Sequence, residues 1–175
     1  TYTQMLNTSG GIEADVTISC LKKNYFRIVC PAVARVHNKS HILRNITQKI
    51  KFKDVTDDYA SFGIFGPNSR KFLTNLVGNH FLSKDFPFAT GKYINFLNVK
   101  IWFQRLSFIG ELGWELYIPI KNSKKIFKKI QNLGKKYNLC YSGMHTLDTL
   151  RLEKKFLHWG HDITSENNPI EAGLR

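Results

Sequence analysis

Short strand-like segments come in pairs along this chain of 175 residues, and single helix-like segments follow them. Residues 15–20 alternate between apolar and polar side chains, which predicts a strand, and residues 25–29 follow as its partner after a polar turn. Connections as short as these cannot hold the crossover that a parallel pair of strands requires. We therefore predict an α+β fold in which antiparallel sheets carry helices packed on one face.

The other elements are predicted from alternation for strands and from a period of about 3.6 residues for helices. Strands are expected at residues 52–55, 59–65, 92–96, 99–107 and 114–118. Helices are expected at residues 37–50, 67–76, 126–133 and 144–155. Pro67 is expected at the first helical position of its helix, where its missing N–H costs nothing.

Basic residues outnumber acidic residues by 26 to 13, which gives a formal net charge of +13. Such a charge favours a polyanionic partner. The cations are spread along the chain, however, so a codon-biased genome explains them as well as a binding surface does. For the lysines at 124, 125, 128 and 129, a solvated helix face is the simpler interpretation.

Composition and motifs exclude several classes of protein and of binding site. Apolar residues make up 42% of the chain, enough for a core, and no apolar run approaches the ~20 residues that cross a bilayer. Neither GxGxxG after a strand nor GxxxxGK[ST] is present, so a phosphate loop for nucleotides is unsupported. Two histidine pairs, His37 with His41 and His158 with His161, lack a third ligand at a metal-binding spacing, and we expect no metal site.

The cysteines Cys20, Cys30 and Cys140 are odd in number and far apart in the sequence. They form neither a disulfide framework nor a CxxC site. We expect free thiols in a reducing compartment, mostly buried as small apolar side chains.

Asp15 follows two glycines, Gly10 and Gly11, and begins an apolar strand. The glycines permit a tight turn or a close approach of the backbone. A carboxylate in this place is partly removed from water and can accept a hydrogen bond from a substrate amine or stabilise a developing cation. From the residue type alone, a structural Asp at a strand end is the simpler interpretation.

Glu111 lies between Gly110 and Gly113 in a predicted loop. Its carboxylate can accept two parallel N–H bonds from an amidine-like edge, such as the 2-amino-pyrimidinone end of a pterin. An exposed Glu at a hairpin tip explains the same residues, and Glu115 in the next strand could equally be exposed. On the last predicted helix, Arg151 follows Asp148 by three residues, so a surface ion pair is the default and a place in the Glu111 cavity is the alternative.

These segments occur in an order that resembles the folate-binding domain of the glycine-cleavage T-protein (aminomethyltransferase) family. The resemblance is greatest to the version fused behind an FAD amine oxidase in dimethylglycine and sarcosine dehydrogenases. It extends over essentially the whole chain and is carried by residues 2–7, 10–15, 63–70, 86–88, 110–117, 147–154, 159–162 and 169–174. No single motif is decisive, whereas the ordered set is specific.

The resemblance implies transfer of a one-carbon unit from an aminomethyl or iminium donor to tetrahydrofolate, as in glycine cleavage or the demethylation of methylated glycines. Asp15 matches the family's catalytic Asp, near the folate nitrogens and the reacting carbon. Glu111 matches the Glu that anchors the pterin, and Arg151 matches an Arg near the ligand. Phe108 occupies the position of a family Tyr in the folate-binding region, which removes one hydroxyl donor.

The resemblance also implies that residues 1–175 are part of a larger folate-binding domain, which begins before Thr1 and continues into a C-terminal barrel after Arg175. FAD is then expected on a separate oxidase domain. The expected ligands are tetrahydrofolate and a methylated-amine-derived or aminomethyl donor, and the anionic glutamate tails of folates suit the charge of +13. We expect no membrane partner, and a location in the bacterial cytoplasm or the mitochondrial matrix.

Two other functions stay open. One is a non-catalytic folate-binding or regulatory module of the same fold, although the presence of both Asp15 and Glu111 argues against it. The other is a basic nucleic-acid binder, against which the absence of a known motif and of clustered cations counts.

Overall fold

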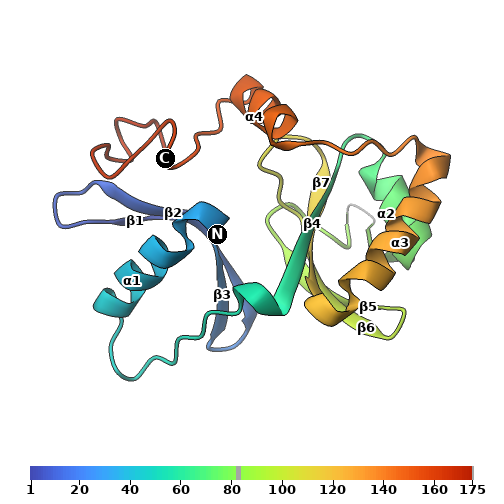
Figure 1. Ribbon diagram of the computed structural model, residues 1–175, viewed down its shortest axis with the longest axis horizontal. Helices are drawn as coiled ribbons and strands as arrows, with labels where there is room; N and C mark the ends of the chain where they lie inside the picture. Colours follow the sequence, from blue (N-terminus) through green and yellow to red (C-terminus); the bar gives the residue numbers. More distant parts are fainter. Residues whose placement is uncertain (82–83, 175) are drawn as a thin grey trace. The chain divides into compact units, whose positions relative to one another are not determined.

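The computed structural model describes residues 1–81 and 84–174, which fall into two compact units (Figure 1). The terminal unit combines Thr1–Asp54 with Leu157–Arg175, so segments from both ends of the sequence build it. The central unit comprises Val55–Phe156. Among the described residues, no helix combines the length and the apolar character that crossing a membrane requires.

The terminal unit contains one antiparallel sheet in the order β1-β2-β3, formed by β1 (Tyr2–Leu6), β2 (Ile12–Lys22) and β3 (Tyr25–Val29). The 3-10 turn η1 (Ala32–Ala34) leads into α1 (Arg35–Asn45). The C-terminal segment is hydrogen-bonded to the start of β2. The backbone N–H of Ile12 donates to the carbonyl of Asn167 at 2.8 Å, and Nε1 of Trp159 donates to the carbonyl of Ile12 at 2.7 Å.

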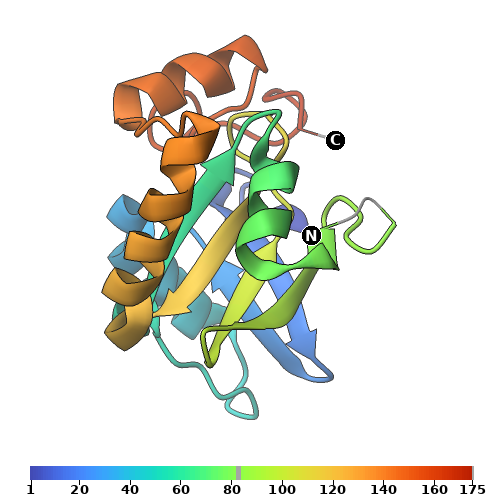
Figure 2. The same cartoon turned by 90° about the vertical axis from the view of Figure 1, so that its right-hand side faces the viewer.

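The central unit contains a four-stranded antiparallel sheet in the order β4-β7-β6-β5. Its strands are β4 (Tyr59–Phe65), β5 (Gly91–Phe96), β6 (Val99–Gln104) and β7 (Gly113–Pro119). The helices are α2 (Ser69–Val77), α3 (Ser123–Gly134) and α4 (Met144–Glu153), with 3-10 turns η2 (Thr56–Asp58), η3 (Asn79–Phe81), η4 (Ile120–Asn122) and η5 (Lys135–Tyr137). Figure 2 shows α2 and α3 side by side on one face of this sheet.

Alternation along β7 decides which side chains face the two helices. Trp114, Leu116 and Ile118 are fully buried and belong to the same apolar core as Phe72 of α2 and Ile126 of α3. Because successive side chains of a strand point to opposite faces, Glu115 and Tyr117 lie on the other face of the sheet. Because the apolar residues of β7 pack against α2 and α3, its polar residues lie on the opposite face of the sheet.

The predicted α+β class, with antiparallel sheets and helices on one face, is confirmed. Some boundaries were wrong. The helix predicted at residues 37–50 ends at Asn45, because Ile46 adopts an extended backbone (ψ 149°) and only Asn38 and Ile42 of this helix are buried. Pro67 is not the first helical residue, since Gly66 (φ +114°) turns the chain and α2 begins at Ser69.

Two strand predictions also differ from the structure. Residues 52–55 form no strand, and β1 was not predicted, although it supplies the edge that pairs with β2. The expectation of mostly buried thiols was wrong as well. Cys20 and Cys140 are exposed, Cys30 is half-buried, and all three are free.

Asn38 is a polar residue on the buried side of α1. Its side chain is only 2% exposed, and within the described part of the chain neither its Oδ1 nor its Nδ2 has a hydrogen-bond partner. A buried amide without partners costs about 1–3 kcal/mol. We therefore expect Asn38→Leu to raise the free energy of unfolding by about that amount in urea denaturation.

The matched control is Asn45→Leu on the same helix. Asn45 is exposed, and its Nδ2 donates to the carbonyl of His41 at 2.8 Å, so its replacement removes a satisfied bond and gives no gain. A loss of stability in Asn38→Leu would show that a group outside the described contacts satisfies this amide.

Candidate functional site

The carboxylate of Asp15 is held by two donors from the neighbouring strand. Gln4 lies directly opposite Asp15 in the pairing of β1 with β2, and its Nε2 donates to Oδ1 of Asp15 at 2.8 Å. Tyr2, two residues earlier on the same face of β1, donates its hydroxyl to Oδ2 at 3.0 Å. One donor on each oxygen fixes the plane and direction of the carboxylate.

Burial perturbs the charge state of this group. Removal from water raises the pKa of the Asp15 carboxyl above its ordinary value, while the bonds from Gln4 and Tyr2 and the charge of His158 offset part of that rise. The pKa of Tyr2 is raised as well, first by burial and then by the charge of Asp15. Tyr2 therefore remains a hydroxyl donor, and Asp15 is a partly desolvated carboxylate with an elevated affinity for a proton or a cation.

Glu13 lies on the same face of β2 as Asp15 and adds a second polar group to it. Nε2 of His37 lies 3.0 Å from the carboxylate Oε1 of Glu13 and 3.0 Å from its backbone carbonyl. The His37 ring also packs against Trp159, with 5.2 Å between ring centroids. This face of β2 therefore presents two carboxylates, each oriented by neighbouring side chains.

Sequence reasoning identified Asp15 but missed Tyr2 and Gln4. The signal was present, because Tyr2 and Gln4 are separated by one residue and so share a face if residues 2–6 form a strand. The segment was too short and too polar to be predicted as one. Only the pairing of β1 with β2 shows that this face meets Asp15.

In the central unit, Glu111 lies in the turn between β6 and β7, as predicted, and is half-buried. Gly110 has φ +71°, and a Cβ at that position would lie 2.3 Å from Cγ of Lys154. The turn therefore needs glycine at this point, where Gly110 lies against Lys154 at the end of α4. Phe108 lies in the same connection and is half-buried.

Glu115 is a second half-buried carboxylate of this unit. The hydroxyl of Tyr117 donates to its Oε2 at 2.6 Å, and burial raises the pKa of Glu115, which the bond from Tyr117 partly offsets. The alternative that Glu115 is an exposed strand residue is wrong. Its neighbours across the sheet are Gly63 of β4, which has no side chain, and Gln104 of β6.

Arg151 is paired with Asp148, as its spacing predicts, at 3.2 Å between Nε and Oδ1. The pair is not a simple surface contact, because the side chain of Arg151 is only 4% exposed. Nη1 of Arg151 also donates to the carbonyl of Phe156 at 3.0 Å, which fixes the chain after α4. These contacts give Arg151 a structural task in addition to the predicted role near a ligand.

The predicted site residues fall into both units. Asp15 belongs to the terminal unit, and Phe108, Glu111 and Arg151 belong to the central unit. Within the described residues, no group of three or more His, Cys, Asp or Glu side chains is arranged to hold a metal ion.

The sequence profile of one family, described as the GCVT N-terminal domain, matches residues 1–175. The chain belongs to this family. The order of segments from Tyr2 to Leu174 that suggested a T-protein-like domain is therefore explained by common descent, and the predicted family is confirmed.

Relatives of this GCVT N-terminal domain include enzymes and a regulatory protein. Human mitochondrial sarcosine dehydrogenase is 34% identical over 99% of the chain, which covers 21% of that protein. Aminomethyltransferase of Halothermothrix orenii is 30% identical over 99% of the chain and 48% of that protein. The mouse mitochondrial pyruvate dehydrogenase phosphatase regulatory subunit is 30% identical over 98% of the chain and 20% of that protein. The chain thus spans between a fifth and a half of these relatives.

A solved structure has the same fold as this GCVT N-terminal domain. The glycine cleavage system aminomethyltransferase T from Bartonella henselae aligns with a TM-score of 0.81 and 22% identity. The alignment covers 99% of this chain and 45% of that chain. Both units and their antiparallel sheets are therefore the architecture of an aminomethyltransferase segment.

Proposed function

We propose that this domain takes part in tetrahydrofolate-dependent one-carbon transfer, moving the carbon of an aminomethyl or iminium donor to tetrahydrofolate. The observation that carries the proposal is the carboxylate of Asp15, partly buried and held on both oxygens by Tyr2 and Gln4. A carboxylate fixed before the substrate arrives can stabilise a cationic nitrogen without reorganising. Membership of the GCVT N-terminal domain family and the kinship with an aminomethyltransferase support the same reaction class.

The chemistry of one-carbon transfer fits the partly desolvated state of the Asp15 carboxylate. In the transfer from an iminium donor, folate N5 adds to the carbon and gives up its proton. N10 then displaces the amine, which leaves with the N10 proton, so that the carbon bridges N5 and N10. Positive charge builds up on the electrophilic carbon and its nitrogen along this path, next to the proposed position of Asp15. Because burial has already weakened the hydration of Asp15, its interaction with a nearby cation is stronger than in water.

The pterin ring needs a carboxylate partner for its two parallel N–H groups. We propose Glu111 for this role, together with Arg151 and Phe108 near the ligand. Glu115 is a second carboxylate with suitable chemistry, since it is half-buried and accepts a hydrogen bond from the hydroxyl of Tyr117. Additional N–H donors from a ligand would lower the raised pKa of Glu115, which is a favourable contribution to binding.

The two glutamates can be distinguished by calorimetric titration of the full-length protein with tetrahydrofolate. We expect the variant that removes the pterin anchor, Glu111→Gln or Glu115→Gln, to weaken binding roughly tenfold to a hundredfold, because a charge-assisted hydrogen bond is lost. Glu153→Gln is the matched control, since Glu153 is an exposed residue of α4. Unchanged binding in both Glu111→Gln and Glu115→Gln would contradict a pterin site in this unit.

A regulatory module without transfer activity is the second candidate, and one observation favours it. The pyruvate dehydrogenase phosphatase regulatory subunit is related over nearly the whole chain. Such a module would bind tetrahydrofolate without producing 5,10-methylenetetrahydrofolate from any donor. Single-turnover assays with an aminomethyl donor and with an oxidised methylglycine therefore decide between the two functions.

The donor is proposed to come from an oxidase domain that carries FAD, outside residues 1–175. The kinship with sarcosine dehydrogenase supports this arrangement. In that case the iminium product of amine oxidation is the substrate of the transfer, and tetrahydrofolate diverts its carbon from release as formaldehyde.

A further inference from the structure

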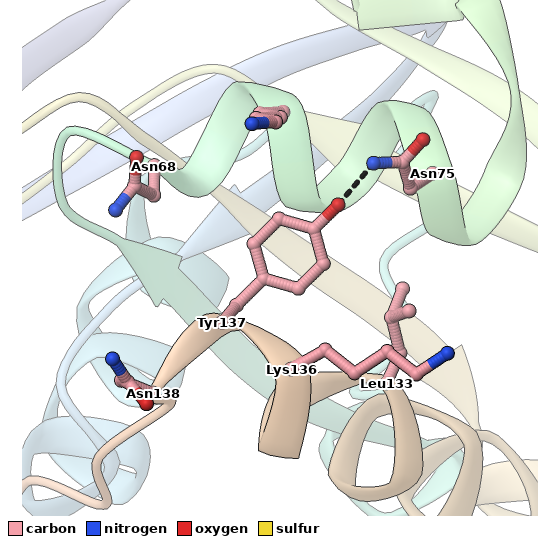
Figure 3. Close-up of a pocket in the computed structure, with 7 residues that line it drawn as sticks. Asn68, Asn75, Leu133, Lys136, Tyr137 and Asn138 are labelled. Atoms are coloured by element: carbon pink, nitrogen blue, oxygen red, sulfur yellow. Dashed lines mark hydrogen bonds between the residues drawn. The ribbon is translucent and has the colours of Figure 1, made fainter.

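A hollow of about 530 Å³ lies on the central unit between α2 and η5, on the helix side of its sheet. Its lining is polar apart from Leu133, and consists of Asn68, Lys71, Asn75, Lys136, Tyr137 and Asn138. Figure 3 shows Tyr137 reaching from η5 to Asn75 on α2, where Nδ2 of Asn75 donates to the tyrosine hydroxyl. This contact connects the two walls of the hollow and fixes one of its sides.

The two sequence segments that form the hollow are rich in cations and contain no carboxylate. Residues 59–84, which include α2, contain no Asp or Glu, and neither do residues 116–147, which include α3 and η5. The central unit holds 16 of the 26 Lys and Arg but only 7 of the 13 Asp and Glu. Eight lysines of α2, η4, α3 and η5 are exposed, namely Lys71, Lys121, Lys124, Lys125, Lys128, Lys129, Lys135 and Lys136.

None of these lysines forms an ion pair with a carboxylate among residues 1–81 and 84–174. The positive charge of this layer is therefore not neutralised by ion pairs within the described residues, and Lys71 and Lys136 approach the same hollow from two elements. Seven of the eight lysines lie between positions 121 and 136 of the sequence, and the fold places Lys71 of α2 in the same hollow as Lys136.

The chemistry of the lining fits a phosphate group. The cations are lysines, which bind phosphate as point charges. Carboxamide and tyrosine hydroxyl groups, with lysine, are the usual side-chain partners of phosphate oxygens. The volume exceeds that of a single phosphate and lies in the range of small-molecule sites.

We propose that the hollow between α2 and η5 binds a multiply charged phosphate compound, such as a diphosphate or a phosphate ester. Lys71 and Lys136 would provide the charge, and Asn68, Asn75 and Asn138 would provide donors around the tetrahedral oxygens. The hollow is distinct from Glu115, because its residues lie on the helix side of the sheet and Glu115 lies on the opposite face.

The test is calorimetric titration of the full-length protein with inorganic pyrophosphate, at constant ionic strength set by chloride. The double variant Lys71→Gln/Lys136→Gln is expected to weaken pyrophosphate binding roughly tenfold or more, since it removes two charge-assisted contacts. Lys124→Gln/Lys128→Gln is the matched control. It removes the same charge from exposed positions of α3 outside the hollow, and we expect less than about a threefold change.

Each result decides the proposal. A selective loss in the Lys71/Lys136 pair supports a built site, and the same selectivity with a nucleotide phosphate as probe supports a phosphate ester as the ligand. Equal losses in both pairs would show a diffuse charge effect and overturn the site. Pyrophosphate binding no stronger than citrate binding would overturn the preference for phosphate, and absence of binding would overturn the proposal altogether.

Discussion

Replacing Asp15 with asparagine is expected to lower the rate of one-carbon transfer roughly 100-fold to 1000-fold, the effect of removing one preorganised electrostatic group from an active site. The asparagine side chain has the same size and can still accept a bond from Gln4 or Tyr2, so the strand pairing is retained. What disappears is the negative charge opposite the developing cation. Single-turnover formation of 5,10-methylenetetrahydrofolate in the full-length protein measures the effect.

The control for this variant is the affinity for tetrahydrofolate, which we expect to change less than about threefold, because the charge is needed mainly in the transition state. Tyr2→Phe provides a graded comparison, since it removes one of the two donors but leaves the carboxylate. A full transfer rate in Asp15→Asn would refute the catalytic role of Asp15, while leaving the family and the fold untouched.

The free energy of unfolding tests the protonation of Asp15 independently of the transfer rate. Burial raises the pKa of Asp15 in the folded state, so the folded protein favours the protonated form. The contribution of Asp15 to stability is then complete below the pKa of the unfolded chain and is lost as the pH rises through the higher folded pKa. We expect Asp15→Asn to gain stability relative to the wild type between acidic and neutral pH, in thermal unfolding followed across that range.

Gly11→Ala is expected to destabilise the protein by about 2–4 kcal/mol, through a clash that relaxation cannot relieve cheaply. A Cβ at Gly11 would lie 1.9 Å from the backbone oxygen of Ser165 and 2.8 Å from Nδ2 of Asn7. Because the nearest atom belongs to backbone, the C-terminal segment would have to move away from β2. Urea denaturation measures the loss, and hydrogen exchange at Ile12, which donates to Asn167, locates it.

Gly143→Ala is the matched control. A Cβ there meets nothing within 4 Å, and the residue has φ −88°, which any amino acid adopts. We expect a change of less than about 1 kcal/mol. Equal stability of Gly11→Ala and the wild type would mean that the C-terminal segment does not lie against Gly11 in solution.

Whether a prediction was correct depended on whether the structural feature leaves a periodic pattern in the sequence. Strands such as β6 and β7 were predictable because a two-sided sheet imposes alternation on consecutive residues, and α3 because its buried Ile126 and Ile130 recur at helical spacing. The edge strand β1 has no such pattern. It is defined by its bonds to β2, which join residues about a dozen positions apart.

Burial was the weakest part of the sequence reasoning. Cys20 is apolar in type yet exposed near the end of β2, and Glu115 is acidic in type yet half-buried. Each follows from position rather than from residue type, because burial depends on which faces of the two sheets are covered. Asn38 is the same case, a polar side chain that the packing of α1 places inside.

By itself, the sequence determined the α+β class, the family and the candidate carboxylates Asp15 and Glu111, because these depend on periodicity and on the order of motifs along the chain. Only the tertiary structure decided that Tyr2 and Gln4 hold Asp15, that Glu115 is partly removed from water, and that Lys71 and Lys136 meet at the hollow between α2 and η5. The physical reason is the same in each case. Hydrogen bonds, desolvation and electrostatic potential depend on distances through space, and folding brings together residues that the sequence keeps apart.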